Sequence, residues 1–222
     1  MSATSGGLLA LLAGGVIGLA GAFVVDQPQP VAIAPPQTET LASFVPSLDN
    51  TPGFPSLKTG DFQLVNHLGE KRRSANPNGE YQLLFFGYAR CKAICSAALP
   101  SMAEATDLLK AMGYDITPVL VTVDPERDTV EALRDAVPKM HTKMVGLTGT
   151  DDALSKAYEA FQITKTFVFE HPDEGAVYTH GSNIFLLSPE GDFRTLLPPI
   201  TSPVRIAEIV AGYIREDSVS GS

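Results

Sequence analysis

Hydrophobic and polar positions divide the chain into an apolar beginning, a proline-rich stretch and a long region in which short apolar runs alternate with helical periodicities. Residues 6–25 read GGLLALLAGGVIGLAGAFVV, and no charged side chain precedes Asp26. A helix of about twenty residues rises about 30 Å, which is enough to cross the hydrocarbon core of a membrane. The pattern therefore predicts an N-terminal transmembrane helix, and we assign residues 1–25 to a membrane anchor.

A cleaved signal peptide is the alternative explanation of this apolar run, with the small residues at 20–22 as its processing site. Signal peptides begin with basic residues and have an apolar core of about 7–15 residues. This chain has no Lys or Arg before its apolar run, and the run is longer. We favour an uncleaved single-pass anchor whose short N-terminal tail stays in the cytoplasm while the downstream domain is exported.

Proline is concentrated in residues 26–56. Seven of the 17 prolines of the chain fall in this stretch, namely Pro28, Pro30, Pro35, Pro36, Pro46, Pro52 and Pro55. Because proline lacks a backbone donor and favours extended polyproline conformations, the composition indicates a semi-rigid linker between the anchor and a globular domain. The alternative interpretation is a disordered segment without a function of its own, and it accounts for any single proline in this stretch equally well.

Residues 57–217 show the patterns of one globular domain, followed by a short tail at 218–222. Short apolar segments predict strands at 63–65, 81–87, 116–123, 166–169, 183–187 and 192–196. Helical periodicity and helix start signals predict helices at 96–112, from 128 or 129 to a point before Pro138, and at 202–215. A further helix through 161 is predicted to be capped by Asp151 or Asp152. Strands that alternate with helices indicate an α/β fold with a helix-covered sheet.

Composition and charge exclude several classes of protein. Hydrophobic residues make up 44% of the 222 positions and charged residues 18%, which excludes a wholly disordered chain. The net charge of −9 argues against a nucleic-acid-binding protein, which usually carries a basic surface. Two cysteines are too few for the disulfide framework of a small secreted domain or for a four-cysteine zinc site.

The two cysteines, Cys91 and Cys95, follow the predicted strand at 81–87 and precede a predicted helix. A helix N-terminus stabilises negative charge, and Arg90 and Lys92 add positive charge beside Cys91. Both effects lower a thiol pKa from about 8.5 toward roughly 3.5–7.5. The four-residue spacing places both sulfurs on one face of a helical turn, close enough to bridge or to share a metal. A pair of inert buried cysteines is the alternative, and it fits poorly beside Arg and Lys.

Two thiolates need a third ligand for most metal sites, and the chain has four histidines: His67, His141, His171 and His180. His180 precedes the predicted strand at 183–187, where its side chain could face the cysteine loop, although a capping or packing role fits it as well. Two soft thiolates with one imidazole suit Cu(I), whereas zinc favours four ligands.

Several motifs together resemble the Sco/SenC family of membrane-tethered proteins with a thioredoxin fold. They are Gly60-Asp61-Phe62 with the later Gly69, FFGYARCKAIC at 85–95, VDPERDT at 123–129, Gly146-Leu147-Thr148-Gly149, and His180 eleven residues before Gly191. The resemblance implies a thioredoxin-like fold, with a central mixed sheet flanked by helices. It also implies copper as Cu(I), with Cu(II) left open, and a role in assembling the CuA centre of cytochrome c oxidase.

By the same resemblance, the metal and redox positions of the family fall on Cys91, Cys95 and His180. Asp124 matches a loop acid that orients the site or a partner, and is the weaker supporting candidate. The implied partners are the oxidase subunit that carries CuA and a donor of copper or electrons. The implied location of the domain is the periplasm or the mitochondrial intermembrane space, on the far side of the membrane from the N-terminus.

Three residues depart from the family pattern: Lys92 and Ser96 replace prolines, and Thr179 replaces an acid before the histidine. The missing acid removes an anchor for His180, and the added charge favours a thiolate nucleophile over a bound cation. Three hypotheses therefore stand beside one another. They are a copper chaperone, a thiol–disulfide reductase in which Cys91 attacks and Cys95 resolves, and a redox sensor whose disulfide state a partner reads. Whether the protein is an enzyme stays open at this point.

Overall fold

The computed structural model describes residues 62–91, 95–172 and 175–220. The expected membrane anchor at 1–25 and the linker at 26–56 lie outside these residues, as do Gly60, Asp61 and Lys92. Within the described part of the chain, no helix is both long enough and apolar enough to cross a membrane.

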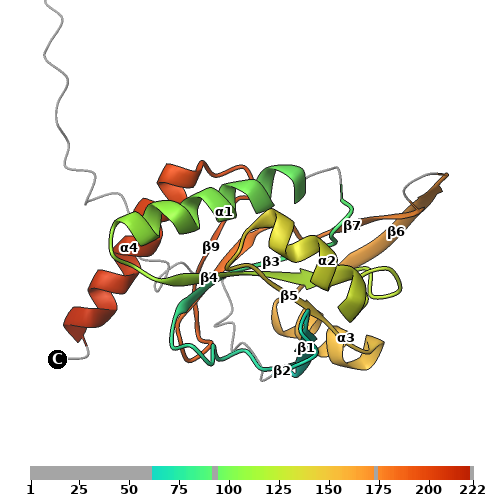
Figure 1. The fold of residues 1–222 in the computed structure, drawn as a ribbon, viewed down its shortest axis with the longest axis horizontal. Coiled ribbons are helices and arrows are strands. Elements are labelled where there is room, and N and C mark those ends of the chain that lie inside the picture. The colour runs from blue at the N-terminus through green and yellow to red at the C-terminus, as the bar shows by residue number, and fades with distance from the viewer. Residues whose placement is uncertain (1–61, 92–94, 173–174, 221–222) are drawn as a thin grey trace, which may run out of the picture. The chain divides into compact units, whose positions relative to one another are not determined.

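The domain is built on a seven-stranded mixed sheet with the strand order β2-β1-β5-β4-β3-β8-β9 (Figure 1). The three central strands β5, β4 and β3 are parallel, and the strands on either side join them in antiparallel pairs. The strand bounds are Leu64–Asn66 (β1), Lys71–Arg72 (β2), Tyr81–Gly87 (β3), Ile116–Thr122 (β4), Val145–Thr148 (β5), Ile184–Leu187 (β8) and Phe193–Leu197 (β9).

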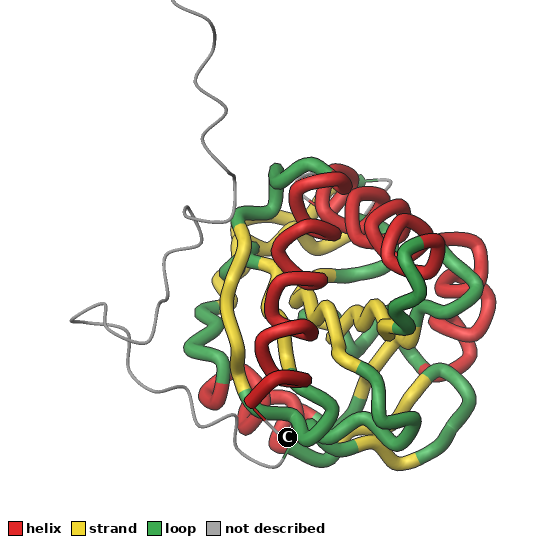
Figure 2. Tube along the Cα trace, turned by 90° about the vertical axis from the view of Figure 1, so that its left-hand side faces the viewer, coloured by secondary structure: helices red, strands yellow, loops and turns green. Residues whose placement is uncertain are grey.

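Helices cover both faces of this sheet. Their bounds are Cys95–Ala111 (α1), Val130–Met140 (α2), Asp151–Ala160 (α3) and Pro203–Ser220 (α4). Buried residues of α1, α2 and α4 form one hydrophobic cluster with one face of the sheet, and α3 packs against the other face. Figure 2 shows the same arrangement after a quarter turn, with helices in red and strands in yellow.

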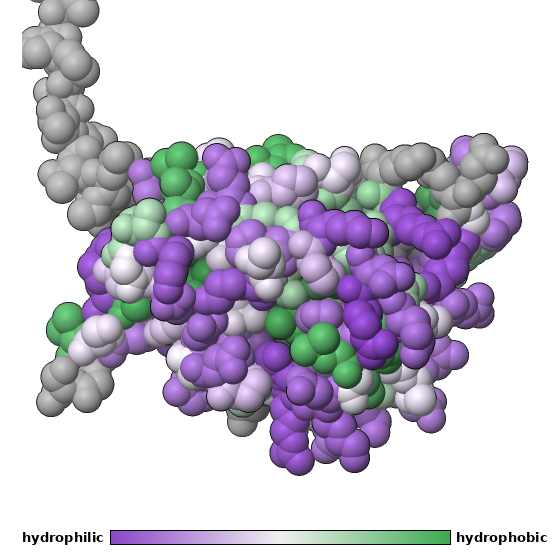
Figure 3. Space-filling model, in the orientation of Figure 1, coloured by the Kyte–Doolittle hydropathy of each residue, from purple (hydrophilic) through white to green (hydrophobic). Residues whose placement is uncertain are grey.

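Strand β3 contributes to both hydrophobic clusters because its side chains alternate between the two faces. Leu83 and Phe85 belong to the cluster under α1, whereas Leu84 and Phe86 belong to the cluster under α3. All four side chains are fully buried. The continuous apolar run at 81–87 therefore fits a central strand that is buried on both sides. The visible surface in Figure 3 is largely hydrophilic, as expected when most large apolar side chains lie inside.

Strands β6 (Lys165–His171) and β7 (Gly175–His180) form a separate two-stranded antiparallel hairpin that extends from one end of the domain (Figure 1). The register pairs Lys165 with His180, with a bulge between Phe167 and Phe169. The sequence predicted only part of β6, and it predicted neither β7 nor the two-residue β2. Most side chains of β6 are exposed, so the hairpin lacks the alternation of buried and polar residues that identifies a strand.

Two sequence predictions about helix ends were wrong. Helix α2 does not end before Pro138 but continues to Met140. A proline in the last turn removes only one backbone hydrogen bond, and packing of the buried Val137 offsets this loss. Helix α3 is capped by Thr150 rather than by Asp151 or Asp152. Pro118 is the third residue of β4 and lies one residue before β4 begins to pair with β5, near the entrance of the strand, where proline is tolerated.

Candidate metal centre

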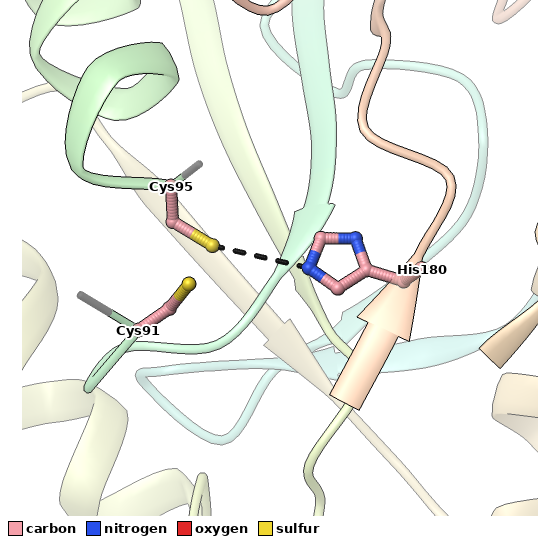
Figure 4. Close-up of side chains that lie close together, drawn as sticks. All are labelled: Cys91, Cys95 and His180. Atoms are coloured by element: carbon pink, nitrogen blue, oxygen red, sulfur yellow. Dashed lines mark hydrogen bonds between the residues drawn. The ribbon is translucent and has the colours of Figure 1, made fainter. Parts of the chain in front are cut away.

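Three predicted site residues, Cys91, Cys95 and His180, lie together at the end of strand β3 (Figure 4). One ligand atom from each of them lies within 4.8 Å of the others. The sulfur of Cys95 is 4.0 Å from Nε2 of His180, and both cysteines are free thiols. With metal–ligand bonds of about 2.0–2.3 Å, three ligands in a plane lie roughly 3.5–4 Å apart. A small contraction would therefore let the three atoms share one ion.

The two cysteines are held by different local structures. Cys91 lies in a turn after β3, where its N–H donates to the Tyr88 carbonyl over 3.1 Å. Cys95 is the first residue of α1. The residues between the two cysteines lie outside the described part of the chain, so the prediction of one shared helical turn stays a prediction. The two sulfurs lie close together, as the sequence predicted.

Gly87, the last residue of β3, makes room for the Cys95 thiol. A Cβ atom at this position would lie 3.0 Å from the Cys95 sulfur and 2.8 Å from Cε1 of Phe85. Carbon and sulfur atoms do not approach this closely without displacement. A residue without a side chain is therefore required here if Cys95 is to keep its position.

His180 is the last residue of β7, and its ring lies edge-on to the aromatic rings of Phe85 and Tyr88 at 6.1 and 6.3 Å. Its Nδ1 is 3.0 Å from the carbonyl oxygen of Gly181. Because a carbonyl only accepts, this hydrogen bond places the proton on Nδ1 and leaves the Nε2 lone pair directed at the sulfurs. The Gly181 carbonyl thus supplies the anchor that Thr179 cannot, and the sequence did not identify it.

Burial separates the two thiols. Cys95 is 1% exposed, whereas Cys91 is partly exposed. A hydrogen bond with Cys91, together with burial, raises the pKa of the Cys95 thiol. Both influences oppose an acidic thiol at Cys95, and the prediction that at least one of the two thiols is acidic stays a prediction. Burial also raises the pKa of the neighbouring Tyr88 to about 12, so its hydroxyl keeps its proton at neutral pH.

The other histidines are engaged elsewhere. Nδ1 of His67 accepts a hydrogen bond from the Gly146 N–H over 3.3 Å. His141 follows α2 and pairs with Asp107 over 3.2 Å. His171 ends β6, where its ring contacts Phe169. None of these three belongs to the group of candidate ligands found among the described residues.

Asp124 is also outside the group of candidate ligands. It is 2% exposed, and its Oδ2 accepts a hydrogen bond from Nε of Arg127 over 2.6 Å. Its other carboxylate oxygen has no hydrogen-bond partner among the residues that the structure describes. The carboxylate therefore does not coordinate with the two thiols and the imidazole, and an indirect role in orienting the site stays a prediction.

Comparison with known proteins identifies the protein family to which the chain is similar. A sequence model of the family described as SCO1/SenC matches residues 50–215. The human mitochondrial SCO1 homolog is 29% identical over 158 residues, which are 70% of this chain and 52% of that protein. The human mitochondrial SCO2 homolog is 33% identical, over 70% of this chain and 59% of that protein. The chain thus spans between half and three fifths of the length of these relatives.

Solved structures show the same fold. Arabidopsis thaliana ScoI with copper bound is 29% identical, with a TM-score of 0.66 over 71% of this chain and 98% of that chain. Yeast Sco1 with copper bound is 24% identical, with a TM-score of 0.64 over 70% and 87% of the two chains. The sequence match extends over most of the described domain, and the mixed sheet with flanking helices is the thioredoxin-like fold that was predicted. This chain therefore belongs to the SCO1/SenC family.

Proposed function

We propose that this protein binds Cu(I) through Cys91, Cys95 and His180 and delivers it during assembly of the CuA centre of cytochrome c oxidase. The convergence of the three ligand atoms within 4.8 Å is the observation that carries this proposal. Two solved structures with the same fold, Arabidopsis thaliana ScoI and yeast Sco1, are described as having copper bound. Two thiolates and one imidazole suit Cu(I), which prefers soft ligands.

The site favours transfer over permanent storage of the metal. Copper would leave by ligand exchange, in which thiolates of the acceptor replace those of the donor one at a time. Cys91 is the partly exposed sulfur and Cys95 the buried one. An acceptor thiolate would therefore first replace Cys91, and copper would remain held by Cys95 and His180 during the exchange.

The proposed setting is a membrane-tethered protein whose domain lies outside the cytoplasm. The charge-free run at 6–25 and the proline-rich linker support the tether. Relatives are named as mitochondrial SCO1 and SCO2 homologs, and the proposed location of the domain is the periplasm or the intermembrane space. The proposed partners are the oxidase subunit that carries CuA and a donor of copper or electrons.

A thiol–disulfide reductase is the second candidate function, and one observation favours it. The buried Cys95 is hydrogen-bonded to the more exposed Cys91, as expected of a resolving and an attacking cysteine. A redox sensor would use the same two thiols. Neither function needs His180 as a ligand, since disulfide exchange requires only an accessible thiolate and its partner.

Replacement of His180 distinguishes copper transfer from thiol chemistry. For a copper carrier, His180→Ala removes the only nitrogen ligand, and the affinity for Cu(I) should fall at least about 10–100-fold in competition with a chelator. His141→Ala is the matched control, because His141 pairs with Asp107 on the surface, outside the group of candidate ligands. Reduction of a disulfide substrate should be unchanged in both variants.

The opposite result would support the reductase. If His180→Ala keeps the Cu(I) affinity of the unmodified protein while Cys91→Ser abolishes it, His180 is not a ligand and the proposed three-ligand site is wrong. If the unmodified protein does not compete with the chelator at all, copper transfer is wrong as a whole.

A further inference from the structure

The loop between β4 and α2 lies against both halves of the candidate metal centre. On the cysteine side, the contact is made by Asp128, which is 3% exposed. Its Oδ2 accepts hydrogen bonds from the Ala89 N–H over 3.0 Å and from the Thr122 hydroxyl over 2.8 Å. Ala89 is two residues before Cys91. Asp128 thus fixes the backbone at the start of the cysteine turn to the central strand β4.

On the histidine side, the contact is made by Arg127. Its Nε donates to Asp124, and its Nη2 donates to the carbonyl oxygen of Ala176 in β7 over 3.2 Å. Nη1 lies 3.8 Å from Glu170 in β6. The guanidinium therefore touches both strands of the hairpin that carries His180, while its own position is fixed by a carboxylate that is almost fully buried.

Gly175 shows how closely Arg127 packs on this hairpin. The residue has a φ of +78°, and a Cβ atom there would lie 1.3 Å from Nη1 of Arg127. The space that a side chain at 175 would occupy is filled by the guanidinium. Only a glycine combines the left-handed backbone with this contact.

The hairpin needs such an anchor because it is a two-stranded sheet apart from the main one. Isolated two-stranded hairpins are at best marginally stable in water. His180 comes four positions after Ala176, a distance of about 13 Å along β7. The side chains of Ala176 and His180 are on the same side of the strand, and Arg127 contacts this strand through the backbone carbonyl oxygen of Ala176.

We propose that Arg127 and Asp128 are positioning residues that hold the histidine hairpin and the cysteine turn in register, so that one short loop sets the separation of the imidazole from the thiols. The proposal rests on the proposed function only where copper affinity is the readout. The two neighbouring side chains act on different halves of the site. Arg127 acts on His180 through Ala176, and Asp128 acts on Cys91 through Ala89.

Arg127→Gln tests the histidine half in the full chain. Hydrogen exchange of the metal-free protein, followed by mass spectrometry, should show at least about tenfold faster exchange of amides in peptides covering 175–180, because a charged hydrogen bond to the hairpin is lost. Cu(I) affinity should fall about 10–100-fold, while the reduction equilibrium of the cysteine pair is unchanged. Arg127→Lys should not restore affinity, because an ammonium cannot contact Asp124 and Ala176 in the same forked geometry.

Arg205→Gln is the matched control. Arg205 forms an ion pair with Glu208 at the same three-residue spacing, but on the exposed surface of α4. This variant should leave hairpin exchange and Cu(I) affinity unchanged. Arg127→Gln leaves the buried Asp124 carboxylate without its partner, which can prevent folding. If the single variant does not fold, the double variant Asp124→Asn/Arg127→Gln is measured in its place.

Asp128→Ala tests the cysteine half. It should accelerate exchange in peptides covering the Ala89 amide, and it should change both the Cu(I) affinity and the alkylation rate of the thiols. Asp128→Asn keeps an acceptor oxygen and should restore slow exchange. This split between the two positions, with Arg127 affecting copper alone and Asp128 affecting copper and thiols, is not expected of residues that merely stabilise the fold.

The rate of amide hydrogen exchange in the hairpin distinguishes failure of this proposal from failure of the proposed function. If Arg127→Gln leaves exchange at 175–180 unchanged, Arg127 does not hold the hairpin and the proposal is wrong, whatever the protein binds. If the unmodified protein binds no Cu(I) but the hairpin loosens in Arg127→Gln, the copper function fails and the positioning role stands.

Discussion

Replacing Gly87 with alanine should disturb the candidate metal centre without replacing any of its ligands. The added methyl group would lie 3.0 Å from the Cys95 sulfur and 2.8 Å from Cε1 of Phe85. Phe85 is fully buried and Cys95 is 1% exposed, so neither side chain can move into solvent. The strand also cannot retreat easily, because β3 pairs with β4 on one side and β8 on the other.

The size of the effect follows from these contacts. Inserting a methyl group into a well-packed core typically costs about 1–3 kcal/mol. The Cys95 sulfur must move by several tenths of an ångström to restore a normal contact, and binding sites tolerate errors of only about 0.5 Å. We therefore expect Gly87→Ala to lower the free energy of unfolding by about 1–3 kcal/mol and to weaken Cu(I) binding as well.

Urea denaturation of the full chain under reducing conditions measures the first effect, and competition with a Cu(I) chelator measures the second. Gly212→Ala in α4 is the matched control, since no atom lies within 4 Å of the added Cβ. Alanine is favoured over glycine inside a helix, so the control should gain about 0.5–1 kcal/mol. A free energy of unfolding for Gly87→Ala within about 0.5 kcal/mol of the unmodified protein would refute the packing argument, because such a change is typical of an unconstrained surface site.

Two further predictions concern other parts of the chain. Thr129→Ala should lower the free energy of unfolding by about 1 kcal/mol in denaturant titrations, because the Thr129 hydroxyl caps α2 by accepting from the Ala132 N–H over 3.2 Å; an unchanged midpoint would contradict this role. A reporter that is active only outside the cytoplasm should be active when fused after Ser222, because the charge-free run at 6–25 is predicted to export the domain. A fusion protein that is produced at full length but whose reporter is inactive would contradict both the tether and the assembly role.

The core of the fold could be predicted because its strands are buried on both faces. The apolar run at 81–87 coincides with β3, and the run at 116–123 exceeds β4 by one residue. Helix α1 begins and ends within one residue of the prediction, and Gly113 follows it with a φ of +87°. Helix α2 extends past Pro138 because tertiary packing overrides the local preference against proline.

The sequence predicted the position of the two cysteines better than the position of the histidine. The cysteine turn follows from a buried strand that leads into a helix, so residues alone located Cys91 and Cys95. His180 was singled out from four histidines by resemblance to the family. Nothing in its own neighbourhood identifies it, because β7 is a half-exposed strand without a clear pattern and is positioned by contacts from the loop at 124–128. Such contacts between distant segments leave no periodic signal.

The two thiols show why charges that are adjacent in sequence do not by themselves predict the pKa of each thiol. Arg90 and the helix start predicted acidic thiols, yet the Arg90 side chain is exposed to solvent, where its charge is screened. Cys95 is buried and hydrogen-bonded to Cys91, and both influences raise its pKa. Exposure therefore distinguishes the two sulfurs better than charge does. Because an incoming thiolate can reach only a sulfur that faces solvent, we expect exchange with any partner to begin at Cys91, whether copper is transferred or a disulfide is exchanged.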